Sequence, residues 1–192
     1  MKILRKIIRR LESNRERKKT FNEIRRLGGV IWNNTKFVNL GVFHFGRNVT
    51  IAGEGIDNVM RSQIVILKDA VLEIGDNTGM SQISITCKQK IHIGLNVKIG
   101  AGTLIFDTNF HNTDWQIRAD HEKDLSYAQN APIHIGDHVF IGTRSIICKG
   151  VTIGDRSIIA AGSVVVKDIP ADCIAGGNPC KVIKKLNENS TD

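Results

Sequence analysis

The residues best suited to chemistry gather in one polar stretch between Ile105 and Ile135, FDTNFHNTDWQIRADHEKDLSYAQNAPIH. The stretch contains His111 and His121, and an imidazole with an ordinary pKa near 6.5 can take up or release a proton at cellular pH. Such a base could activate a hydroxyl nucleophile. A histidine in an arbitrary loop is more often just solvated, so its surroundings must decide its role.

The four cysteines suggest neither a metal site nor a disulfide framework. Cys87, Cys148, Cys173 and Cys180 are spaced 61, 25 and 7 residues apart, which matches neither a zinc pattern nor a disulfide-dense domain. We expect reduced thiols in a cytoplasm.

Charge and composition exclude several classes of protein. With 41% hydrophobic and 24% charged residues, the chain of 192 residues is too apolar to be disordered. Residues 1–28 hold 11 Lys and Arg against 3 Glu, whereas residues 29–192 hold 16 basic against 16 acidic residues. A neutral body argues against nucleic-acid binding. No apolar run is long enough for a membrane span, and bases interrupt the start too often for a signal peptide, so we expect a cytoplasmic protein.

A six-residue repeat runs through the second half of the chain. Residues 135–170 read IGDHVF, IGTRSI, ICKGVT, IGDRSI, IAAGSV and VVKDIP. The second position is mostly small, the fifth is small or β-branched, and the first is always aliphatic: Ile135, Ile141, Ile147, Ile153, Ile159 and Val165. Because an α-helix turns every 3.6 residues or so, a column of period six would wind around it, which excludes a helix.

Short strands joined by turns account for this period. Three hexapeptides close a triangular coil that stacks the aliphatic column inside, a parallel β-helix. Earlier matches, including Ile74-Gly75 and Ile93-Gly94, extend the recognisable repeats to about residue 45. We predict an all-β fold with a repeat domain over 29–170, a protruding loop over 107–131, and a C-terminal extension over 171–192 that contains a short helix.

The basic segment 1–28 predicts an amphipathic helix. Its apolar residues fall at helical spacing, with bases on the other side: Ile3, Leu4, Ile7, Ile8 and Leu11 against Lys2, Lys6, Arg9 and Arg10. Two interpretations stay open. The helix packs on its own domain or a neighbouring subunit, or it lies on an anionic membrane, where each base contributes about 1 kcal/mol.

Four motifs in a fixed order carry a family resemblance: DTNFH at 107–111, IGDHVFIG at 135–142, VTIGDRSIIAAGSVVVKDIP at 151–170 and GGNPCKVIKKL at 176–186. Together they resemble the hexapeptide-repeat acyltransferases, left-handed β-helix enzymes that move an acetyl group from acetyl-CoA to a hydroxyl or amine. Within that family they are similar to the maltose and galactoside O-acetyltransferases and to the O-acetyltransferases of capsule, exopolysaccharide and lipopolysaccharide assembly. The resemblance implies acetyl-CoA as co-substrate, no metal, a homotrimer with sites between neighbours, and a sugar hydroxyl of a glycan or glycolipid precursor as acceptor.

The same resemblance assigns His111 as the general base. It would take the proton of the sugar hydroxyl, which would then attack the thioester directly. Backbone N–H groups at Gly142 or Thr143 would meet the oxyanion. Asp107 or Asn109 would fix the histidine tautomer or hold the acceptor.

Further positions follow from the family pattern. Phe140 stands where relatives often carry Trp beside the acyl site, and keeps an aromatic wall without the indole donor. Trp115 is a candidate platform for stacking a sugar.

Coenzyme A binding is implied at the last coils and the tail. Backbone groups at Thr143 and Ala161 match those that hold the pantetheine arm. The nucleotide end would meet Val166, Lys167 and Lys184, with Lys181 nearby, since ammonium groups are suited to phosphates. Lysine at 181 and 184, where many relatives have arginine, keeps the charge but loses bidentate geometry.

Other functions remain open. An N-acetyltransferase on an amino sugar would use the same fold and base, and a streptogramin-type drug acetyltransferase would leave the basic segment unexplained. A non-catalytic prism could serve as a scaffold. The γ-class carbonic anhydrases share the prism and bind zinc through three histidines, but their pair is separated by four residues, whereas His134 and His138 are separated by three, so we expect no metal.

Overall fold

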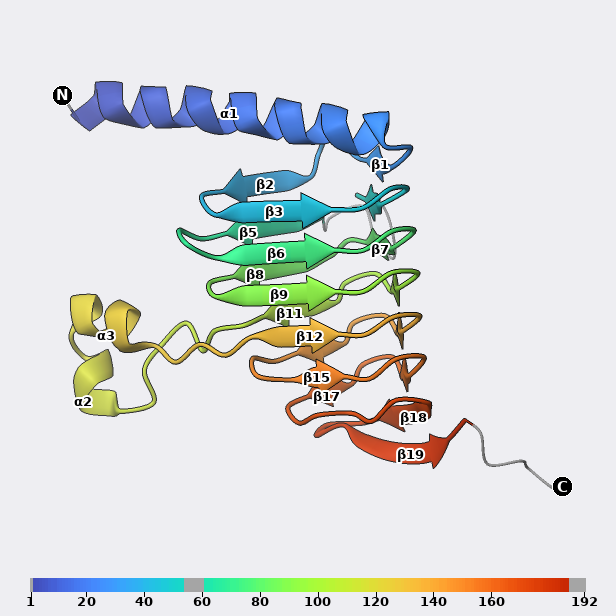
Figure 1. Ribbon diagram of the computed structural model, residues 1–192. Coiled ribbons are helices and arrows are strands. Elements are labelled where there is room, and N and C mark those ends of the chain that lie inside the picture. Colours follow the sequence, from blue (N-terminus) through green and yellow to red (C-terminus); the bar gives the residue numbers. More distant parts are fainter. Residues whose placement is uncertain (1, 54–60, 187–192) are drawn as a thin grey trace, which may run out of the picture.

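The chain forms a three-sided prism of stacked strands with a helix across one end and a loop projecting from its side (Figure 1). The structure is a computed structural model that describes residues 2–53 and 61–186, with side chains in the first helix from residue 14 onward. Apart from one antiparallel pair at its end, every paired strand is parallel to its neighbours. The parallel β-helix predicted from the repeats is therefore confirmed.

Each side of the prism is one parallel sheet, and successive strands pass from one side to the next. Face A contains, in spatial order, β1 (Val30–Ile31), β4 (Thr50–Ala52), β7 (Gly79–Ser81), β10 (Lys98–Ile99), β13 (Phe140–Ile141), β16 (Ile158–Ile159), β18 (Cys173–Gly176) and β19 (Lys181–Lys185). Face B contains β2 (Lys36–Asn39), β5 (Gln63–Ile66), β8 (Ser84–Cys87), β11 (Leu104–Phe106), β14 (Ile146–Ile147) and β17 (Val164–Val165). Face C contains β3 (Val42–Phe45), β6 (Val71–Ile74), β9 (Lys90–Ile93), β12 (Ile133–Ile135) and β15 (Thr152–Ile153).

Two columns of the hexapeptide fill the interior. The first-position residues from Ile135 to Val165 are all fully buried, as the repeat predicts. The fifth-position residues form a second buried column: Val139, Ser145, Val151, Ser157, Ser163 and Ile169. The buried serines satisfy their hydroxyls on turn carbonyls; Ser145 Oγ, for example, donates to Gly142 O at 2.8 Å. A polar residue is thus tolerated inside because the turn supplies its acceptor.

Small residues at the second position let successive turns stack closely. A Cβ added to Gly142 would lie 2.4 Å from the backbone nitrogen of Ala161 in the next coil. Any side chain at this position would force the coils apart, which explains why the repeat places glycine there.

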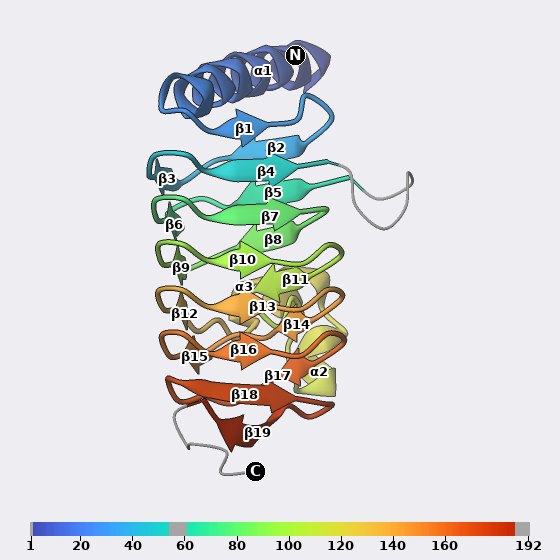
Figure 2. The same cartoon turned by 90° about the vertical axis from the view of Figure 1, so that its right-hand side faces the viewer.

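The first helix, α1 (Lys2–Arg26), lies across one end of the prism (Figures 1 and 2). Phe21 and Ile24 are buried, and Phe21 packs edge-on against Phe37 with ring centroids 6.0 Å apart. The second half of α1 therefore packs on its own domain. The apolar positions predicted from Ile3 to Leu11 lie outside the described side chains.

The coils reach further at both ends than the recognisable repeats. The first coil begins at Val30, where β1 pairs with β4, and β18 continues face A beyond Pro170 to Gly176. Early coils are hard to see in the sequence because aromatic residues such as Phe37, Phe43 and Phe45 replace the aliphatic column.

The predicted C-terminal helix is wrong. Residues Lys181–Lys185 form the strand β19, which pairs antiparallel with β18 in the register Gly176 with Lys181 and Ile174 with Lys184. The exposed edge of β18 offers a ladder of backbone hydrogen bonds that a lone amphipathic turn cannot match. Residues 187–192 of the predicted extension lie outside the described residues.

Within the described ranges, none of the helices has the length and apolar composition of a membrane span.

Candidate functional site

The loop between β11 and β12 is a compact unit with a closed base. An antiparallel bridge joins Thr108 to Asn130, and Asn109 N donates to Gln129 O at 2.9 Å. The loop carries two short helices, α2 (Trp115–Arg118) and α3 (His121–Tyr127), each capped by an aspartate that accepts from backbone N–H groups, Asp114 and Asp120 respectively. The Asn and Asp content that excludes this stretch from the core is thus what builds its turns and caps.

His111 is held by a carboxylate from α3. Its Nδ1 lies 2.6 Å from Oδ2 of Asp124, and the other oxygen of Asp124 accepts from Asn112 N at 2.6 Å. The Asp124 side chain is 5% exposed, whereas that of His111 is 64% exposed. The pair therefore combines a buried anchor with an imidazole presented to solvent.

Electrostatics fix the proton on this pair. The hydrogen bond to His111, followed by that from the Asn112 N–H, holds the pKa of Asp124 below its usual range. An ionised carboxylate at Nδ1 favours the tautomer with its proton on Nδ1. The lone pair of Nε2 is then directed away from the anchor, which suits a general base.

Phe110 turns the chain at His111. Its φ of 61° lies in the left-handed region, which is sparsely populated for a bulky residue and costs about 1–3 kcal/mol. The Phe110 ring packs against Phe106 at 5.5 Å, and its N–H donates to Thr108 Oγ1. The left-handed turn at this residue places His111 where its ring reaches Asp124 of α3.

The predicted role of Asp107 in orienting the histidine is wrong. Asp107 is fully buried, and its two oxygens accept from Lys88 N at 2.7 Å and Gln89 N at 2.8 Å. It fastens the root of the loop to the turn after β8. The orienting carboxylate is Asp124, which the sequence reasoning missed because it lies thirteen residues from His111 and comes close only when α3 folds back.

Other predicted residues of the loop lie near its base or on its surface. Asn109 is half-buried at the base, next to the turn that carries His111. Trp115 opens α2 and is 69% exposed, so its indole is free to stack on a ligand. His121, the first residue of α3, is exposed.

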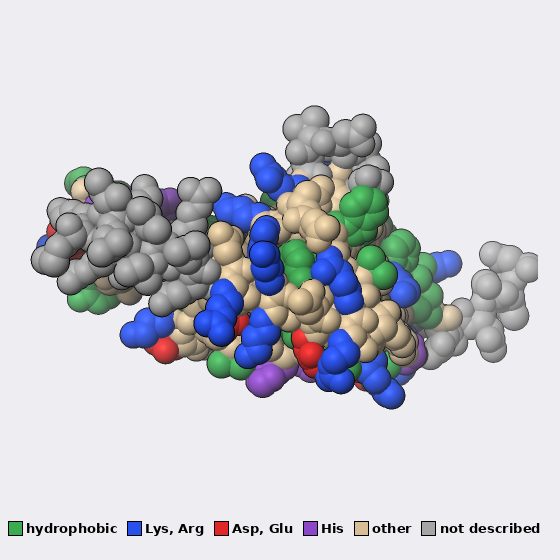
Figure 3. Space-filling model, turned by 90° about the horizontal axis from the view of Figure 1, so that it is seen from above, with side chains coloured by type: hydrophobic (Ala, Val, Ile, Leu, Met, Phe, Trp, Pro, Cys, Tyr) green, Lys and Arg blue, Asp and Glu red, His purple; other side chains and the backbone are tan. Residues whose placement is uncertain are grey.

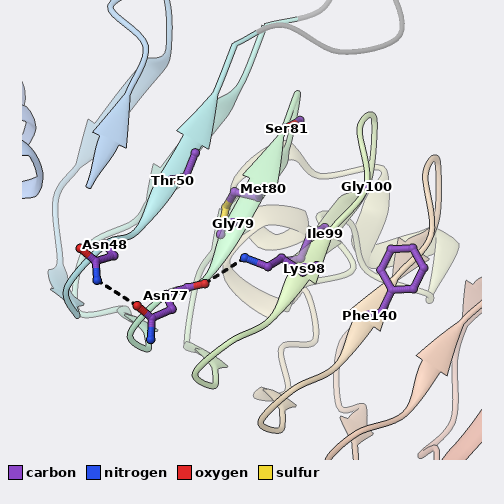
Figure 4. A pocket seen from close by; sticks show the side chains of 10 residues that line it. All are labelled: Asn48, Thr50, Asn77, Gly79, Met80, Ser81, Lys98, Ile99, Gly100 and Phe140. Carbon is purple, nitrogen blue, oxygen red and sulfur yellow. Dashed lines mark hydrogen bonds between the residues drawn. The ribbon is translucent and has the colours of Figure 1, made fainter. Parts of the chain in front are cut away.

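Phe140 borders a pocket on face A (Figure 4). The pocket has a volume of about 360 Å³, and its centre is an outward row that the strand register aligns as Thr50, Gly79, Lys98 and Phe140. The hollow exists because Gly79 has no side chain at a position where neighbouring coils carry one. Other lining residues were missed by sequence reasoning: Asn48, Asn77, Met80, Ser81, Ile99 and Gly100.

The corner between faces A and B brings Thr143 and Ala161 together. Gly162 N donates to Thr143 O at 2.8 Å, so the two turns stack directly. The Gly142 N–H, however, donates to Ile159 O at 2.7 Å within the ladder. The expectation that Gly142 supplies an oxyanion donor is therefore wrong, and Thr143 remains the candidate at this corner.

The other residues predicted to meet coenzyme A lie at the last coil and the terminal hairpin. Val166 is 46% exposed and Lys167 follows it in the turn after β17. Lys181 and Lys184 lie on β19, both exposed. Val164 links the two elements, since it donates to Gly177 O and accepts from Cys180 N.

The remaining histidines form no site with three ligands. His92 and His134 stack on face C with ring centroids 4.7 Å apart, and His92 Nδ1 lies 3.1 Å from Glu73 Oε2. Burial, and then the neighbouring His92, lower the pKa of His134. His138 is exposed in a turn with φ of 58°. Among the described residues, no group of three His, Cys, Asp or Glu could hold a metal ion.

The loop and the face A pocket lie on opposite sides of the prism. In Figure 1 α2 and α3 project to the left, whereas in Figure 2 face A is turned to the viewer and the loop lies behind it. Within one chain, the loop that carries His111 therefore lies on the side of the prism away from the face A pocket.

Comparison with known proteins identifies the family to which this fold belongs. Residues 132–167 match the family described as the hexapeptide repeat of succinyl-transferase. The galactoside O-acetyltransferase of Escherichia coli is 33% identical over 143 residues, a match that covers 64% of this chain and 68% of that enzyme. The chain belongs to the hexapeptide-repeat acetyltransferase family. The prism is accordingly the left-handed β-helix of that family, as the resemblance implies.

Further members of the hexapeptide-repeat acetyltransferase family cover the chain to different extents. A Saccharomyces cerevisiae protein with an acetyltransferase name is 44% identical over 119 residues, which span 62% of this chain and 58% of that protein. The crystal structure of a maltose O-acetyltransferase from Clostridium difficile is 32% identical with a TM-score of 0.58, and covers 95% of this chain and 84% of that one. A Vibrio cholerae hexapeptide-repeat acetyltransferase solved with acetyl coenzyme A has a TM-score of 0.53 at 26% identity, covering 91% and 79%.

Proposed function

We propose that the protein transfers an acetyl group from acetyl-CoA to a sugar hydroxyl of a glycan or glycolipid precursor, with His111 as general base. The observation that carries this proposal is the exposed imidazole held at Nδ1 by the buried Asp124, on the projecting loop of a family prism. The galactoside and maltose O-acetyltransferase relatives support the choice of acceptor class and of acetyl-CoA as donor.

The reaction follows from the direction of the imidazole. His111 Nε2 takes the proton of the acceptor hydroxyl as its oxygen attacks the thioester carbonyl. The Thr143 N–H stabilises the resulting oxyanion, because its turn lies at the corner next to the Phe140 strand. The intermediate then expels the thiolate of coenzyme A, which takes the proton back from the imidazolium. Asp124 stays ionised and stabilises the charged imidazolium between these steps.

Donor binding would use the stacked corner and the terminal hairpin. Thr143 and Ala161 offer backbone groups for the pantetheine arm, and Val166 an exposed apolar contact. Lys167, Lys181 and Lys184 would neutralise the phosphates of the nucleotide end. Gly142 contributes by letting these turns stack, because its N–H already donates to Ile159 O and is not available to the donor substrate.

The opposed positions of loop and pocket support a homotrimer with shared sites. Because the loop that carries His111 and the face A pocket lie on opposite sides of one prism, a site that uses both needs an interface between copies. A loop from one copy would place His111 against the face A pocket of the next, with Phe140 as the aromatic wall and Trp115 and Asn109 near the acceptor.

We propose that the protein acts in the cytoplasm and that its reaction belongs to polysaccharide biosynthesis. Residues 1–28 would add a peripheral contact with an anionic inner membrane surface, where such precursors are assembled. The excess of Lys and Arg in this segment is the support for that contact.

A titration of acetyl-CoA and desulfo-CoA into the purified protein tests the donor half of the reaction. We expect saturable binding with about one site per chain. Light scattering on the same sample should give the mass of a trimer. Sugars are then screened for acetyl acceptance, and the mass and base stability of the product separate an O-acetyl ester from an N-acetyl amide. A folded trimer that binds neither ligand would overturn the proposal and leave a non-catalytic prism.

A further inference from the structure

A basic surface covers the end of the prism that α1 closes. Seen from this end, Lys and Arg side chains gather over the helix (Figure 3). The described half of α1 carries two acidic residues, Glu16 and Glu23, against six basic ones: Arg15, Arg17, Lys18, Lys19, Arg25 and Arg26. Some of these basic side chains line a pocket.

The pocket lies between α1 and the turn that follows β1. It has a volume of about 240 Å³ and is lined by Arg17, Lys18, Phe21, Asn22, Arg25 and Asn33. Three of these residues are cations, two are amides, and the lining contains no carboxylate. It is a concave site with donors on several sides.

The guanidinium of Arg25 is fixed in place. Its Nη2 donates to Ile31 O at 3.2 Å and to Asn33 Oδ1 at 2.7 Å. Arg17 and Arg25 both approach the Phe21 ring, at 5.7 and 5.9 Å from its centroid. Because Phe21 is itself anchored on Phe37, two cations are held about one ring that cannot move away.

Helix geometry keeps the acidic residues off this pocket. At about 100° per residue, Arg17, Phe21 and Arg25 lie on one side of α1, and Glu16 and Glu23 lie near the opposite side. Glu23 is engaged there by Arg26, with Nη2 and Oε1 2.6 Å apart. The positive charge of the pocket is therefore left without an internal counterion among its lining residues.

We propose that this pocket binds a phosphate group. Arginine forks match phosphate oxygens in pairs, a lysine adds a mobile charge, and the Asn22 and Asn33 side chains can complete the set of hydrogen bonds. The group belongs either to a soluble phosphate ester or to the headgroup of an anionic lipid. The site goes beyond the proposed acetyl transfer and lies at the end of the prism opposite Lys167, Lys181 and Lys184.

The test compares two variants of the full-length protein that each remove two charges from α1. Arg17→Gln/Lys18→Gln alters the pocket, and Arg15→Gln/Lys19→Gln is the matched control outside its lining. Inorganic pyrophosphate is titrated by calorimetry. Cosedimentation uses phosphatidylcholine vesicles made equally anionic with phosphatidic acid or with oleic acid, whose charge is a carboxylate.

We expect the pocket variant to lose about 10-fold or more in affinity while the control stays within about 2-fold of wild type. Pyrophosphate binding with this pattern identifies a soluble phosphate ligand. The pattern on phosphatidic acid vesicles alone, above oleic acid vesicles, identifies a lipid phosphate. Equal losses in both variants, or no binding to any probe, would overturn the proposal. Equal binding to both vesicles would overturn it when pyrophosphate does not bind either. Lys18→Gln alone, at an exposed position, repeats the test should the double variant unfold.

Discussion

The prism and its projecting loop are built by opposite means. In the coils, aliphatic side chains stack without polar partners, and the backbone ladder supplies most of the hydrogen bonds. In the loop, the hydrogen bonds of Asp114, Asp120, Asn112 and Asp124 to nearby backbone groups define the shape, and Asp124 and Ala128 are its only buried residues between Asn109 and Asn130. The stable part of the molecule thus carries no proton chemistry, while the part that carries it rests on a few directional contacts.

This contrast predicts which changes affect activity and which affect stability. Substitutions in the loop should alter turnover at nearly constant melting temperature. Substitutions in the columns should lower the stability of the fold. The molecules that remain folded should keep a turnover close to that of wild type.

Replacement of the base should have the largest effect. We expect His111→Ala to lower turnover by about 10²- to 10⁴-fold, because the acceptor hydroxyl loses its general base. The melting temperature should stay close to wild type, since the side chain is largely exposed. Release of coenzyme A measured with a thiol reagent checks the rate. His121→Ala, an exposed histidine in the same loop, is the control, and equal losses in the two variants would contradict the assignment.

Truncation inside the prism should cost stability instead. Ile147→Ala removes a fully buried side chain from the aliphatic column and should lower the free energy of unfolding by about 2–5 kcal/mol. Urea denaturation followed by circular dichroism measures the change. Thr152→Ala, at an exposed position of β15, should change it by less than about 0.5 kcal/mol. Comparable losses would mean that the column is not the source of stability.

Asp124→Asn should slow the reaction by about 10²-fold or more, with a small but measurable loss of stability at neutral pH. Its oxygen can still accept from Asn112 N–H, but the amide N–H₂ then faces His111 Nδ1 and moves the ring proton to Nε2. The base would carry its proton at the wrong nitrogen. Turnover measured over a range of pH tests this explanation against simple disorder of the loop, because the effect of the wrong tautomer persists at high pH. Full activity at high pH would contradict the positioning role.

Acid should weaken the loop before the prism. The pKa of Asp124 is lowered in the folded protein, so its stabilising contribution is present above the unfolded value near 3.9 and is lost as pH falls through the folded value. The difference in melting temperature between wild type and Asp124→Asn should therefore shrink as the pH falls below about 4. A difference that stays constant to lower pH would show that Asp124 is not linked to folding.

The smallest effect should come from the pocket. A Cβ at Gly79 would lie 3.6 Å from Lys98 Nζ, an ordinary contact, so Gly79→Ala should fold normally. It should raise KM for the acceptor by a few-fold, since it fills the hollow beside Phe140. Initial rates over a range of acceptor concentration test this. Gly102→Ala is not a suitable control, because Gly102 has φ of 76° and any other residue there would be strained.

The sequence predicted the regular part of the molecule because a single rule repeats there. Each coil of residues 135–170 places an aliphatic residue at the same phase, so one hexapeptide predicts the next. The rule weakens upstream, where the rings of Phe37, Phe43 and Phe45 replace aliphatic residues and pack on one another. It also says nothing of the tail, where the apolar spacing of Val182, Ile183 and Leu186 resembles a helix but pairing with β18 makes a strand.

The candidate site was less predictable because its contacts are distant in the chain. His111 stands in a recognisable motif, but its partner Asp124 is one of several loop acids and only α3 brings it near. The nearby Asp107 seemed the natural partner, yet its oxygens are satisfied by backbone amides of an earlier coil. The face A pocket depends on Gly79, a position distinguished by the absence of a side chain.

The elements at the two ends of the prism limit its length. A stack of parallel coils has no inherent stopping point, since each coil presents the next with unpaired backbone groups and an open apolar core. Here α1 covers one end with Phe21 and Ile24, and the antiparallel turn of β19 reverses the chain at the other. We therefore expect these two elements to hinder end-to-end polymerisation of the prism into fibres.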